Sequence, residues 1–333
     1  MKITILGGLG FIGFNNYLNL ITKHKIQIID NLSGNSSKKN FKLLKKKFPN
    51  QKICKLNIKN YNSLKKVLLK FNPSTILFAA GQIAVTKSIK NPREDFESTF
   101  LGAFNSLEFI RNYSRKTKLI YLSSNKVYGN LNRLKLKENK RRYTNLGKEI
   151  DENTPLNFAS PYGCSKGSSD QYVADYSKTY GLNTVVLRLS CIYGPNQWGT
   201  EDQGWISWFI IKSLNGSKIN IFGNGKQVRD ILHITDLVNL INKCILKKNH
   251  NGNIYNIGGG VKNSISLLEL IYHLQKFTDK RINYKLNKER IGDQKYFVNN
   301  LAKVKKNLNW QPKISIIKGI KSFQNWIKNN IIN

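Results

Sequence analysis

Tyr162 and Lys166 are the residues of this sequence whose types and spacing most directly suggest acid–base chemistry. They lie four residues apart in the segment SPYGCSKGSSDQY, with small residues between and after them. A phenol titrates near ~10 and is a poor base at neutral pH. A neighbouring ammonium and a positively charged hydride acceptor both favour the phenolate, so we expect Lys166 and such an acceptor together to lower the pKa of Tyr162. Tyr162 could then accept a proton from an alcohol while a hydride leaves the same carbon.

The spacing alone is weak evidence, because a Tyr/Lys pair four residues apart is usually a helix-surface contact. In this lysine-rich chain it recurs at Tyr61/Lys65, Tyr272/Lys276 and Tyr284/Lys288. The surroundings of the pair at 162 are different. Ser124 precedes Tyr162 by 38 residues at the end of the apolar run KLIYLSS, and Pro161 can open the helix that carries the pair. Since open α/β sheets bind ligands at the carboxyl ends of their strands, we expect Ser124, Tyr162 and Lys166 to face one crevice.

A glycine-rich segment near the start of the chain predicts a nucleotide cofactor. GGLGFIG contains Gly7, Gly10 and Gly13 between a β-rich run and a helical pattern. Glycines there permit a tight turn and let backbone N–H groups approach a pyrophosphate. Asp30 ends the next strand, where a carboxylate would bind a ribose 2′-hydroxyl and repel a 2′-phosphate. The sequence therefore favours NAD over NADP, although the lysines at 38–39 blur this preference.

Alternating strands and helices must position these residues. Apolar runs predict strands at 2–6, 26–30, 53–58, 74–80, 118–124 and 183–190, and helical patterns follow the glycines to about 24 and lie at 62–71, 93–113 and 164–180. Strands that are apolar throughout indicate a parallel sheet covered on both faces. We expect an α/β fold, a Rossmann-type doubly wound parallel sheet with a smaller α/β substrate-binding lobe. The expected domains are 1–190, with later returns around 225–260, and 191–333 for most of the lobe.

The composition excludes several other classes of protein. The net charge of +36 comes from 45 Lys and 10 Arg against 19 acidic residues. Lysine is spread along the chain, whereas nucleic-acid binders cluster their charge and favour arginine, so we expect no nucleic-acid partner. No stretch approaches the ~18 apolar residues of a membrane span. The four cysteines show neither metal spacing nor a paired framework, which favours a cytoplasmic protein without a metal.

Longer motifs resemble one family. GGLGFIG, SSNKVYG (123–129) and YGCSK (162–166) resemble the extended short-chain dehydrogenases/reductases, the superfamily of NAD-dependent nucleotide-sugar epimerases and dehydratases. GNGKQVRDILHITD, YNIGGG and ERIGDQKYFVNN are similar to later signatures of that superfamily. Within it, AAGQIAVTKSIKNP, RRYT, FASPYGCSKGSSDQYVADY and EDQGWISWF resemble the branch of CDP-sugar 2-epimerases that interconvert CDP-paratose and CDP-tyvelose. The resemblance implies an isomerase of lipopolysaccharide O-antigen synthesis.

The resemblance also implies roles for particular residues. The catalytic group would be Ser124, Tyr162 and Lys166. NAD would contact Gly7, Gly10, Phe11, Ile12, Gly13, Asp30, Asn31, Asn57, Ile58, Ala79, Ala80, Gly81, Gln82, Thr99, Tyr162, Lys166 and Ser190. The nucleotide-sugar substrate would contact Ser124, Asn125, Arg229 and Arg290, the two arginines holding its diphosphate. Thr99 departs from the family, which usually has Asn at that position.

The reaction implied is redox-neutral. Carbon 2 of the sugar becomes a ketone and is reduced again from its other face, and the choice of C2 over C4 rests on the resemblance alone. A UDP-hexose 4-epimerase or another nucleotide-sugar reductase stays open as an alternative. A 4,6-dehydratase usually has an Asp-Glu pair after the catalytic hydroxyl residue, where this chain has Asn125-Lys126, and this weighs against elimination.

Two further expectations concern partners. The intact Ser124, Tyr162 and Lys166 argue against a protein that only binds NAD or nucleic acid. Segments 93–113 and 164–180 carry apolar positions on more than one face, and in relatives the two matching helices pair across a two-fold axis. We therefore expect a homodimer or homotetramer.

Overall fold

The computed structural model describes residues 1–290 and 292–332, which form two compact units. Unit 1 comprises Met1–Val127, Ser160–Arg188 and Val238–Tyr255. Unit 2 comprises Tyr128–Ala159, Leu189–Leu237 and the chain from Asn256 onward. Residues 128–159 thus fall in unit 2, within the range that was expected to belong to the sheet domain. The roles of the two units stay predictions.

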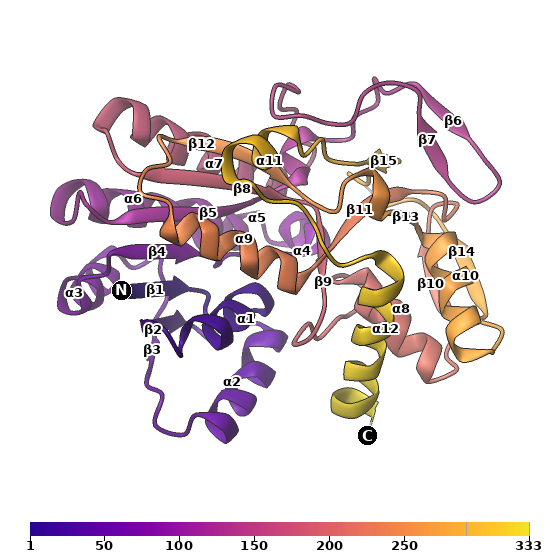
Figure 1. Ribbon diagram of the computed structural model, residues 1–333, viewed down its shortest axis with the longest axis horizontal. Coiled ribbons are helices and arrows are strands. Elements are labelled where there is room, and N and C mark those ends of the chain that lie inside the picture. Colours follow the sequence, from indigo (N-terminus) through magenta and orange to yellow (C-terminus); the bar gives the residue numbers. More distant parts are fainter. Residues whose placement is uncertain (291, 333) are drawn as a thin grey trace. The chain divides into compact units, whose positions relative to one another are not determined.

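Unit 1 contains a seven-stranded sheet with the order β12-β8-β5-β4-β1-β2-β3 (Figure 1). Its strands are β1 (Lys2–Leu6), β2 (Lys25–Asp30), β3 (Ile53–Lys55), β4 (Thr75–Phe78), β5 (Lys118–Ser124), β8 (Thr184–Leu189) and β12 (Asn253–Ile257). β1 pairs in parallel with β2 and β4, β2 with β3, and β4 with β5. The chain therefore winds outward from β1 in both directions, and the predicted Rossmann-type fold class is confirmed.

Helices flank this sheet because its strands are apolar on both faces. They are α1 (Phe11–Leu20), α2 (Asn35–Lys47), α3 (Tyr61–Phe71), α4 (Val85–Lys90), α5 (Pro92–Phe96), α6 (Gly102–Tyr113), α7 (Pro161–Tyr180) and α9 (Ile234–Leu246), with the turns η1 (Glu97–Leu101) and η2 (Asn125–Tyr128). Phe78 and Tyr121 of the sheet pack in one buried cluster with Leu68 of α3, Leu107 of α6 and Val173 of α7. This cluster fixes one face of the sheet against α3, α6 and α7.

The helix that carries the candidate catalytic pair is defined at both ends by local sequence. The Ser160 side chain caps α7 by accepting from the Gly163 N–H at 3.1 Å, and Pro161 occupies the first turn. Gly181 ends the helix in the left-handed conformation, with φ of 67°. The predicted helix at 164–180 is therefore present and begins three residues earlier.

The predicted helix at 93–113 is interrupted. α5 is followed by η1, a π-helical turn, and only then by α6. A π-helical turn inserts extra backbone into a helix and often lies at a functional site. It changes which residues of this segment face α7, and the hydrophobic pattern of the sequence did not predict it.

Unit 2 is built from small sheets and helices. The strands are β6 (Leu136–Glu138), β7 (Tyr143–Asn145), β9 (Cys191–Tyr193), β10 (Ile219–Phe222), β11 (Val228–His233), β13 (Ser264–Ser266), β14 (Tyr284–Asn287) and β15 (Tyr296–Phe297). The helices are α8 (Trp205–Leu214), α10 (Leu267–Thr278), α11 (Ala302–Leu308) and α12 (Ile316–Ile327), with the turns η3 (Val261–Asn263) and η4 (Lys328–Ile332). β11 is central, since it pairs with β9, β13 and β15. Ile231 of β11 shares a buried cluster with Phe209, Leu270 and Phe323 of the surrounding helices.

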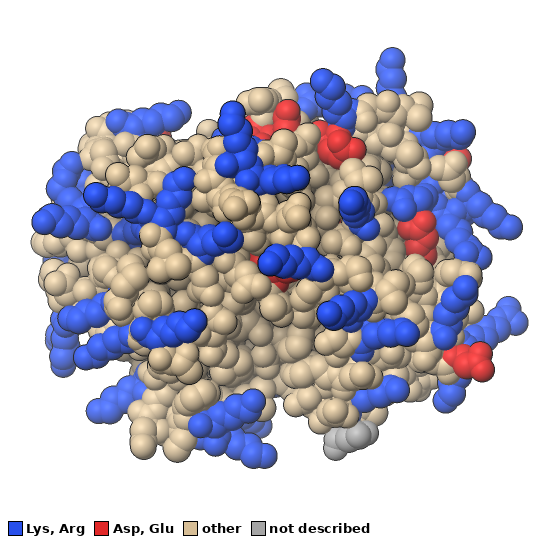
Figure 2. Space-filling view, in the orientation of Figure 1, with Lys and Arg blue, Asp and Glu red and all other residues tan. Residues whose placement is uncertain are grey.

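Positive charge is spread over the surface. Figure 2 shows Lys and Arg side chains scattered across the visible face, with few Asp and Glu among them. Among the described residues, no helix has the length and apolar character needed to cross a membrane. The scattered pattern on this face matches the spread of lysine along the sequence.

Candidate active site

Tyr162 is held at the start of α7 by contacts with its backbone. Its N–H donates to the hydroxyl of Ser88 on α4 at 3.1 Å, and its side chain is 8% exposed. The Ser88 hydroxyl in turn donates to the Val85 carbonyl at 2.7 Å. The phenol interacts with the Ser124 side chain, which ends β5. The strand end and the first turn of α7 therefore bring Ser124 and Tyr162 together, as expected from the sequence.

Lys166 lies one turn further along α7 and is 5% exposed. Its ammonium donates to the Leu122 carbonyl at 2.9 Å and lies 5.3 Å from the centre of the Tyr121 ring. The Ser124 hydroxyl donates to Asn125 Oδ1 at 3.3 Å and accepts from the Lys126 N–H at 3.2 Å. The described structure thus gathers Ser124, Tyr162 and Lys166 around the carboxyl end of β5.

The electrostatics of the pair depend mainly on burial. Burial raises the pKa of Tyr162 to about 12, with the Ser124 hydrogen bond acting to lower it and Asp95 to raise it. Burial lowers the pKa of Lys166 to about 8, and Asp95 raises it. The chain's own groups therefore do not lower the pKa of Tyr162, because the loss of water around the phenolate outweighs the favourable contacts. The contribution expected from a positively charged nicotinamide stays a prediction.

Two buried polar side chains beside this group were not predicted from the sequence. One is Ser88, whose hydroxyl accepts from the Tyr162 N–H as described above. The other is Asp95 on α5, which is 0% exposed, and the Ser165 hydroxyl and the Lys166 ammonium act on its carboxyl. In the sequence Asp95 stands in PREDF, which has the character of a charged surface turn. Nothing in that segment shows that the carboxylate points inward.

A buried ion pair fixes α7 to the sheet. Arg188 of β8 donates to both carboxylate oxygens of Asp170 on α7, each at 2.8 Å. The two side chains are 3% and 0% exposed. Because both charges are out of water and doubly hydrogen-bonded, the pair sets the position of α7, and with it the placement of Tyr162 and Lys166.

The glycine loop has the shape that a pyrophosphate needs. Gly7 has φ of +74°, and a Cβ there would lie 2.7 Å from the backbone of Ala80, in the loop that follows β4. A Cβ at Gly13 would lie 2.8 Å from the Gly8 Cα, so this glycine lets α1 pack closely on the loop. Gly10 faces open space apart from the Gly7 carbonyl at 3.3 Å, and α1 has no side-chain cap at this end. Uncapped N–H groups at a helix start suit an anion.

Phe11 and Ile12 form the first turn of α1, directly after this loop. Asp30 ends β2, where its carboxylate accepts from the backbone N–H of Leu9 at 2.9 Å and of Leu32 at 2.8 Å. Asn31 follows it and accepts from the Ser33 N–H at 3.0 Å. The structure therefore brings Asp30 to the glycine loop, the position from which a carboxylate can reach a ribose.

The remaining predicted cofactor contacts of unit 1 lie on loops after β3 and β4. Ile58 packs against Gly102 of α6, and the Asn57 side chain accepts from the Lys59 N–H at 3.1 Å. Ala79–Gln82 follow β4, and Gly81 has φ of +124°. A Cβ at Gly81 would lie 2.8 Å from Thr99 Oγ1, so Thr99 lies directly against this turn.

The two predicted substrate-binding arginines of unit 2 both have contacts with Asp293. Arg229 of β11 pairs with Asp293 at 2.6 Å, and the Asp293 N–H donates to the Arg290 carbonyl at 3.2 Å. Arg290 lies 3.6 Å from Asp202 and stacks 3.8 Å from the centre of the Phe222 ring. Each of the two arginines therefore lies beside a carboxylate, Arg229 beside Asp293 and Arg290 beside Asp202.

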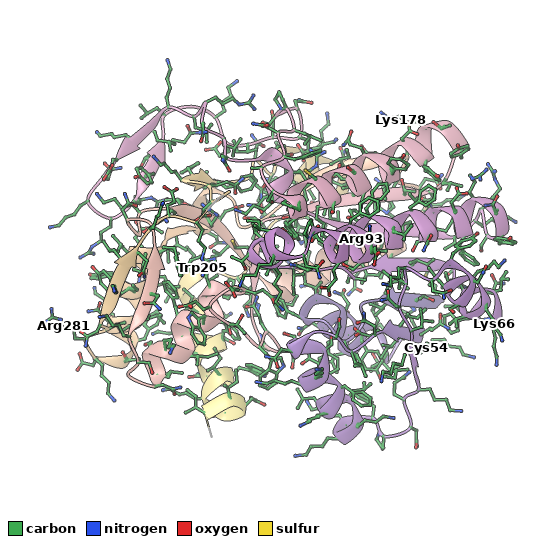
Figure 3. The ribbon with its side chains drawn as sticks, turned by 180° about the vertical axis from the view of Figure 1, so that it is seen from behind. Cys54, Lys66, Arg93, Lys178, Trp205 and Arg281 are labelled. Atoms are coloured by element: carbon green, nitrogen blue, oxygen red, sulfur yellow. The ribbon has the colours of Figure 1, made fainter. Side chains whose placement is uncertain are left out.

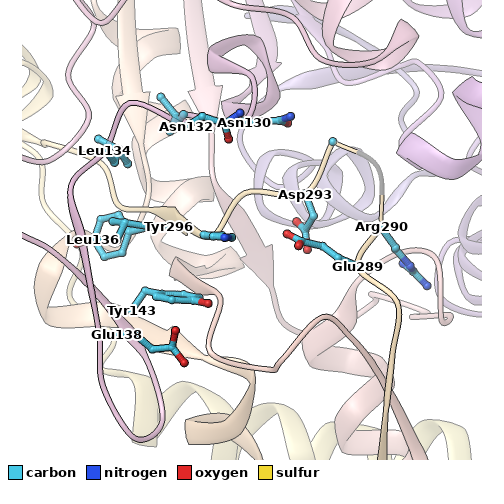
Figure 4. Close-up of a pocket in the computed structure, with 13 residues that line it drawn as sticks. Asn130, Asn132, Leu134, Leu136, Glu138, Tyr143, Glu289, Arg290, Asp293 and Tyr296 are labelled. Atoms are coloured by element: carbon cyan, nitrogen blue, oxygen red, sulfur yellow. The ribbon is translucent and has the colours of Figure 1, made fainter.

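A cavity of about 710 Å³ opens beside Arg290 and Asp293. Figure 4 shows Arg290 and Asp293 on one side of it and Tyr143 and Glu138 of the β6–β7 hairpin on the other. Ser190 is held elsewhere in unit 2, where its hydroxyl donates to Asp230 Oδ1 at 2.5 Å. Ser190 is therefore engaged by a buried carboxylate in the described structure.

The doubly wound sheet, the glycine loop and the Ser–Tyr–Lys group define an extended short-chain dehydrogenase/reductase. The family model described as GDP-mannose 4,6 dehydratase matches residues 4–323, and the chain belongs to this family.

Similar proteins include epimerases and dehydratases of nucleotide sugars. CDP-paratose 2-epimerase of Salmonella typhi is 40% identical over 336 residues, covering 98% of this chain and 99% of that protein. The structure of UDP-glucose 4-epimerase from Thermotoga maritima with UDP-glucose has a TM-score of 0.84 at 27% identity, covering 99% and 100% of the two chains. The structure of dTDP-glucose 4,6-dehydratase from Bacillus anthracis with NAD has a TM-score of 0.81 at 28% identity, covering 99% and 97%.

Proposed function

We propose that this chain is an NAD-dependent nucleotide-sugar epimerase that inverts C2 of a CDP-sugar, interconverting CDP-paratose and CDP-tyvelose. The observation that carries the proposal is the buried group of Ser124, Tyr162 and Lys166, in which Ser124 is directly followed in sequence by Asn125-Lys126. An acid pair at that point would favour elimination, and this chain has none there. The similarity to the Salmonella typhi enzyme extends over nearly the whole of both chains and supports the choice of sugar.

The cofactor loop fits NAD. Gly10 leaves room for a pyrophosphate at the uncapped start of α1, and Asp30 supplies a carboxylate for a ribose beside it. The dehydratase structure from Bacillus anthracis, at 28% identity, contains NAD. Phe11, Ile12 and Gly13 would line the pyrophosphate, and Asn31, Asn57 and Ile58 the adenosine.

Tyr162 is the acid–base group of the proposed reaction. NAD, when bound, supplies a reversible hydride acceptor beside the sugar and a positive charge that favours the phenolate. Tyr162 takes the proton from the C2 hydroxyl as the sugar becomes a 2-keto sugar, and returns it after the sugar has presented its other face. Ser124 donates a hydrogen bond to the reacting oxygen. Lys166 supplies a positive charge to the site, and its ammonium is positioned by donating to the Leu122 carbonyl.

The two arginines would bind the substrate diphosphate. Planar guanidinium groups form paired hydrogen bonds with phosphate oxygens, and each of the two arginines lies beside a carboxylate. A diphosphate would compete with Asp293 for Arg229 and with Asp202 for Arg290. Loss of either arginine should therefore raise KM more than it lowers kcat.

A UDP-hexose 4-epimerase is the second candidate. The similarity to the Thermotoga maritima structure with UDP-glucose favours it, because the same catalytic group can oxidise C4 instead of C2. The choice depends on how the sugar is oriented, and the catalytic residues themselves do not determine it.

We also propose a cytoplasmic homo-oligomer that supplies sugars for lipopolysaccharide O-antigen synthesis. An aromatic face on unit 1 supports the assembly. Phe96 and Tyr172 are 49% and 43% exposed, and Phe100 lies between them with ring centres 5.2 Å from each. Covering such a face with a second copy would remove apolar area from water. Light scattering after gel filtration should give a dimer or tetramer, and Tyr172→Lys should shift it toward a monomer.

Incubation of the purified protein with CDP-paratose, without added oxidant, tests the reaction. Proton NMR should show CDP-tyvelose accumulating to an equilibrium mixture. A parallel sample with UDP-glucose should stay unchanged. Unchanged CDP-paratose together with formation of UDP-galactose would establish the second candidate instead.

A further inference from the structure

Asp95 is a buried carboxylate without ordinary hydrogen-bond partners. It lies on α5, is 0% exposed, and neither oxygen makes a hydrogen bond within the described residues by normal distance and angle. Its neighbours on α5 differ, since the Arg93 side chain is 88% exposed and Glu94 is exposed. Burying an isolated ionised carboxylate is expensive unless another charge compensates for it. The position therefore calls for a nearby cation.

Lys166 is a buried cation, 5% exposed, on α7, the helix that packs against α5. Figure 3 views the molecule from behind and labels Arg93 of α5 and Lys178 near the end of α7. The Ser165 hydroxyl and the Lys166 ammonium both lower the pKa of Asp95, while its burial raises it. Asp95 in turn raises the pKa of Lys166.

The other titratable groups around Asp95 do not provide a second cation. On its own helix, Glu94 raises the pKa of Asp95. On α4, Lys87 and Lys90 are exposed to solvent. On η1, Glu97 pairs with Lys59 at 2.9 Å.

Two tyrosines complete the surroundings. The charge on Asp95 raises the pKa of Tyr162 on α7 and of Tyr121 on β5. Both are acids that gain a negative charge when they ionise, so neither can compensate for the carboxylate. Among the groups that act on Asp95 in the described structure, only Lys166 carries positive charge.

We propose that Asp95 is a positioning residue that acts as the buried counter-ion of Lys166 and keeps this lysine protonated inside the site. The consequence for chemistry rests on the proposed function: an ammonium at position 166 stabilises the Tyr162 phenolate, and a neutral amine would not. Burial alone works against that ammonium. A carboxylate on the neighbouring helix α5 offsets the free-energy cost of burying the Lys166 ammonium.

The charge on Asp95 also limits how readily Tyr162 ionises, because like charges repel. Asp95 therefore has two opposite effects, direct repulsion of the phenolate and indirect support through Lys166. Without the carboxylate, burial alone would act on Lys166, whose pKa of about 8 already lies close to neutral pH.

Titration of Lys166 itself tests the proposal without any substrate. Protein labelled with ¹³C at lysine Cε would be titrated by NMR, with the Lys166 resonance assigned by its loss in Lys166→Met. Lys166 should titrate near its pKa of about 8. In Asp95→Asn we expect its pKa to fall by about one unit or more, the usual effect of losing an adjacent opposite charge.

Two variants serve as controls for Asp95→Asn. Glu94→Gln removes an exposed carboxylate from the same helix and should leave the Lys166 titration unchanged. Asp95→Glu keeps the charge and should return the pKa of Lys166 toward the parent value. If Asp95→Asn does not fold, Asp95→Glu is compared with the parent alone, and its Lys166 should titrate close to that of the parent. An unchanged Lys166 pKa in folded Asp95→Asn, or a fall as large in Glu94→Gln, would overturn the proposal.

The pH dependence of turnover links the charge pair to catalysis. In Asp95→Asn the alkaline limb of kcat/KM should move to lower pH by about the same shift as the Lys166 titration. If the titration shifts but no CDP-sugar is turned over, the charge pair stands and the proposed function fails. If CDP-paratose is turned over while the lysine titration does not move, the proposed function stands and the role of Asp95 is refuted.

Discussion

The buried pair of Asp170 and Arg188 allows a sharp test of what holds the catalytic helix in place. The two side chains are 0% and 3% exposed and share two hydrogen bonds of 2.8 Å. Removing one partner leaves the other charge buried and unpaired, which costs about 3–5 kcal/mol. We therefore expect Arg188→Met to lower the free energy of unfolding by about that amount, a large part of the ~5–15 kcal/mol typical of a domain.

Urea unfolding of a matched set of variants would measure this. Arg111 and Glu108 form a more exposed counterpart, with the same two 2.8 Å contacts at side-chain exposures of 34% and 20%, so Arg111→Met should cost at most about 1 kcal/mol. The double variant Asp170→Leu with Arg188→Met removes both buried charges and should recover most of the loss. A cost below about 1 kcal/mol for Arg188→Met, or a double variant less stable than either single one, would refute the reasoning.

Three further outcomes are expected. Tyr162→Phe should keep bound cofactor, measured by absorbance after denaturation, but lose about 10²–10⁴-fold in kcat, the usual contribution of a general base; near-parent turnover would show that another group is the base. Burial lowers the pKa of Lys166 from 10.5 to about 8, so between these pH values the unfolded chain binds a proton that the folded protein does not, and stability rises with pH. The stability of the cofactor-free parent relative to Lys166→Met should therefore increase by about 3 kcal/mol from pH 7 to 10.5 in urea unfolding, and a flat difference would contradict the shift. Lys118 donates to the carbonyls of Cys244 and Ile245 at 3.0 and 2.6 Å, so Lys118→Met should leave buried acceptors unpaired and cost about 1–3 kcal/mol in the same assay, whereas a neutral effect would show that the contacts contribute little.

Much of unit 1 could be predicted because its signals are local. Apolar runs with buried residues on both faces marked β1, β4 and β5, and the glycines at 7 and 13 stand where a side chain would meet backbone. Ser160, Pro161 and Gly181 mark the ends of α7 in the sequence itself. These features are determined by residues within a few positions of one another, so they can be recognised in a single sequence.

The parts that escaped prediction depend on residues far apart in the chain. In the sequence Asp95 resembles a surface acid, and its burial arises only because α5 packs against α7. The π-helical turn at 97–101 leaves no hydrophobic pattern of its own, and it divides what was expected to be one helix. The pairing of Arg229 with Asp293 joins positions 64 residues apart, and the inclusion of residues 128–159 in unit 2 depends on tertiary contacts alone.

The pKa of Tyr162 shows a limit of a different kind. The sequence identifies the partners that favour a phenolate, but it does not contain the degree of burial, which has the larger effect. Predicted roles for Ser124, Tyr162, Lys166 and the arginines therefore stay proposals about chemistry, while their placement is a property of the structure.

The central claim is that hydrogen leaves and returns to C2 of the sugar as hydride, with Tyr162 handling only the hydroxyl proton. Incubation with CDP-paratose in deuterium oxide, followed by NMR, tests it most directly. We predict that CDP-tyvelose forms and that both sugars keep protium at C2, since a hydride held beside the sugar does not exchange with water. Deuterium appearing at C2, or CDP-paratose left unchanged, would contradict the account.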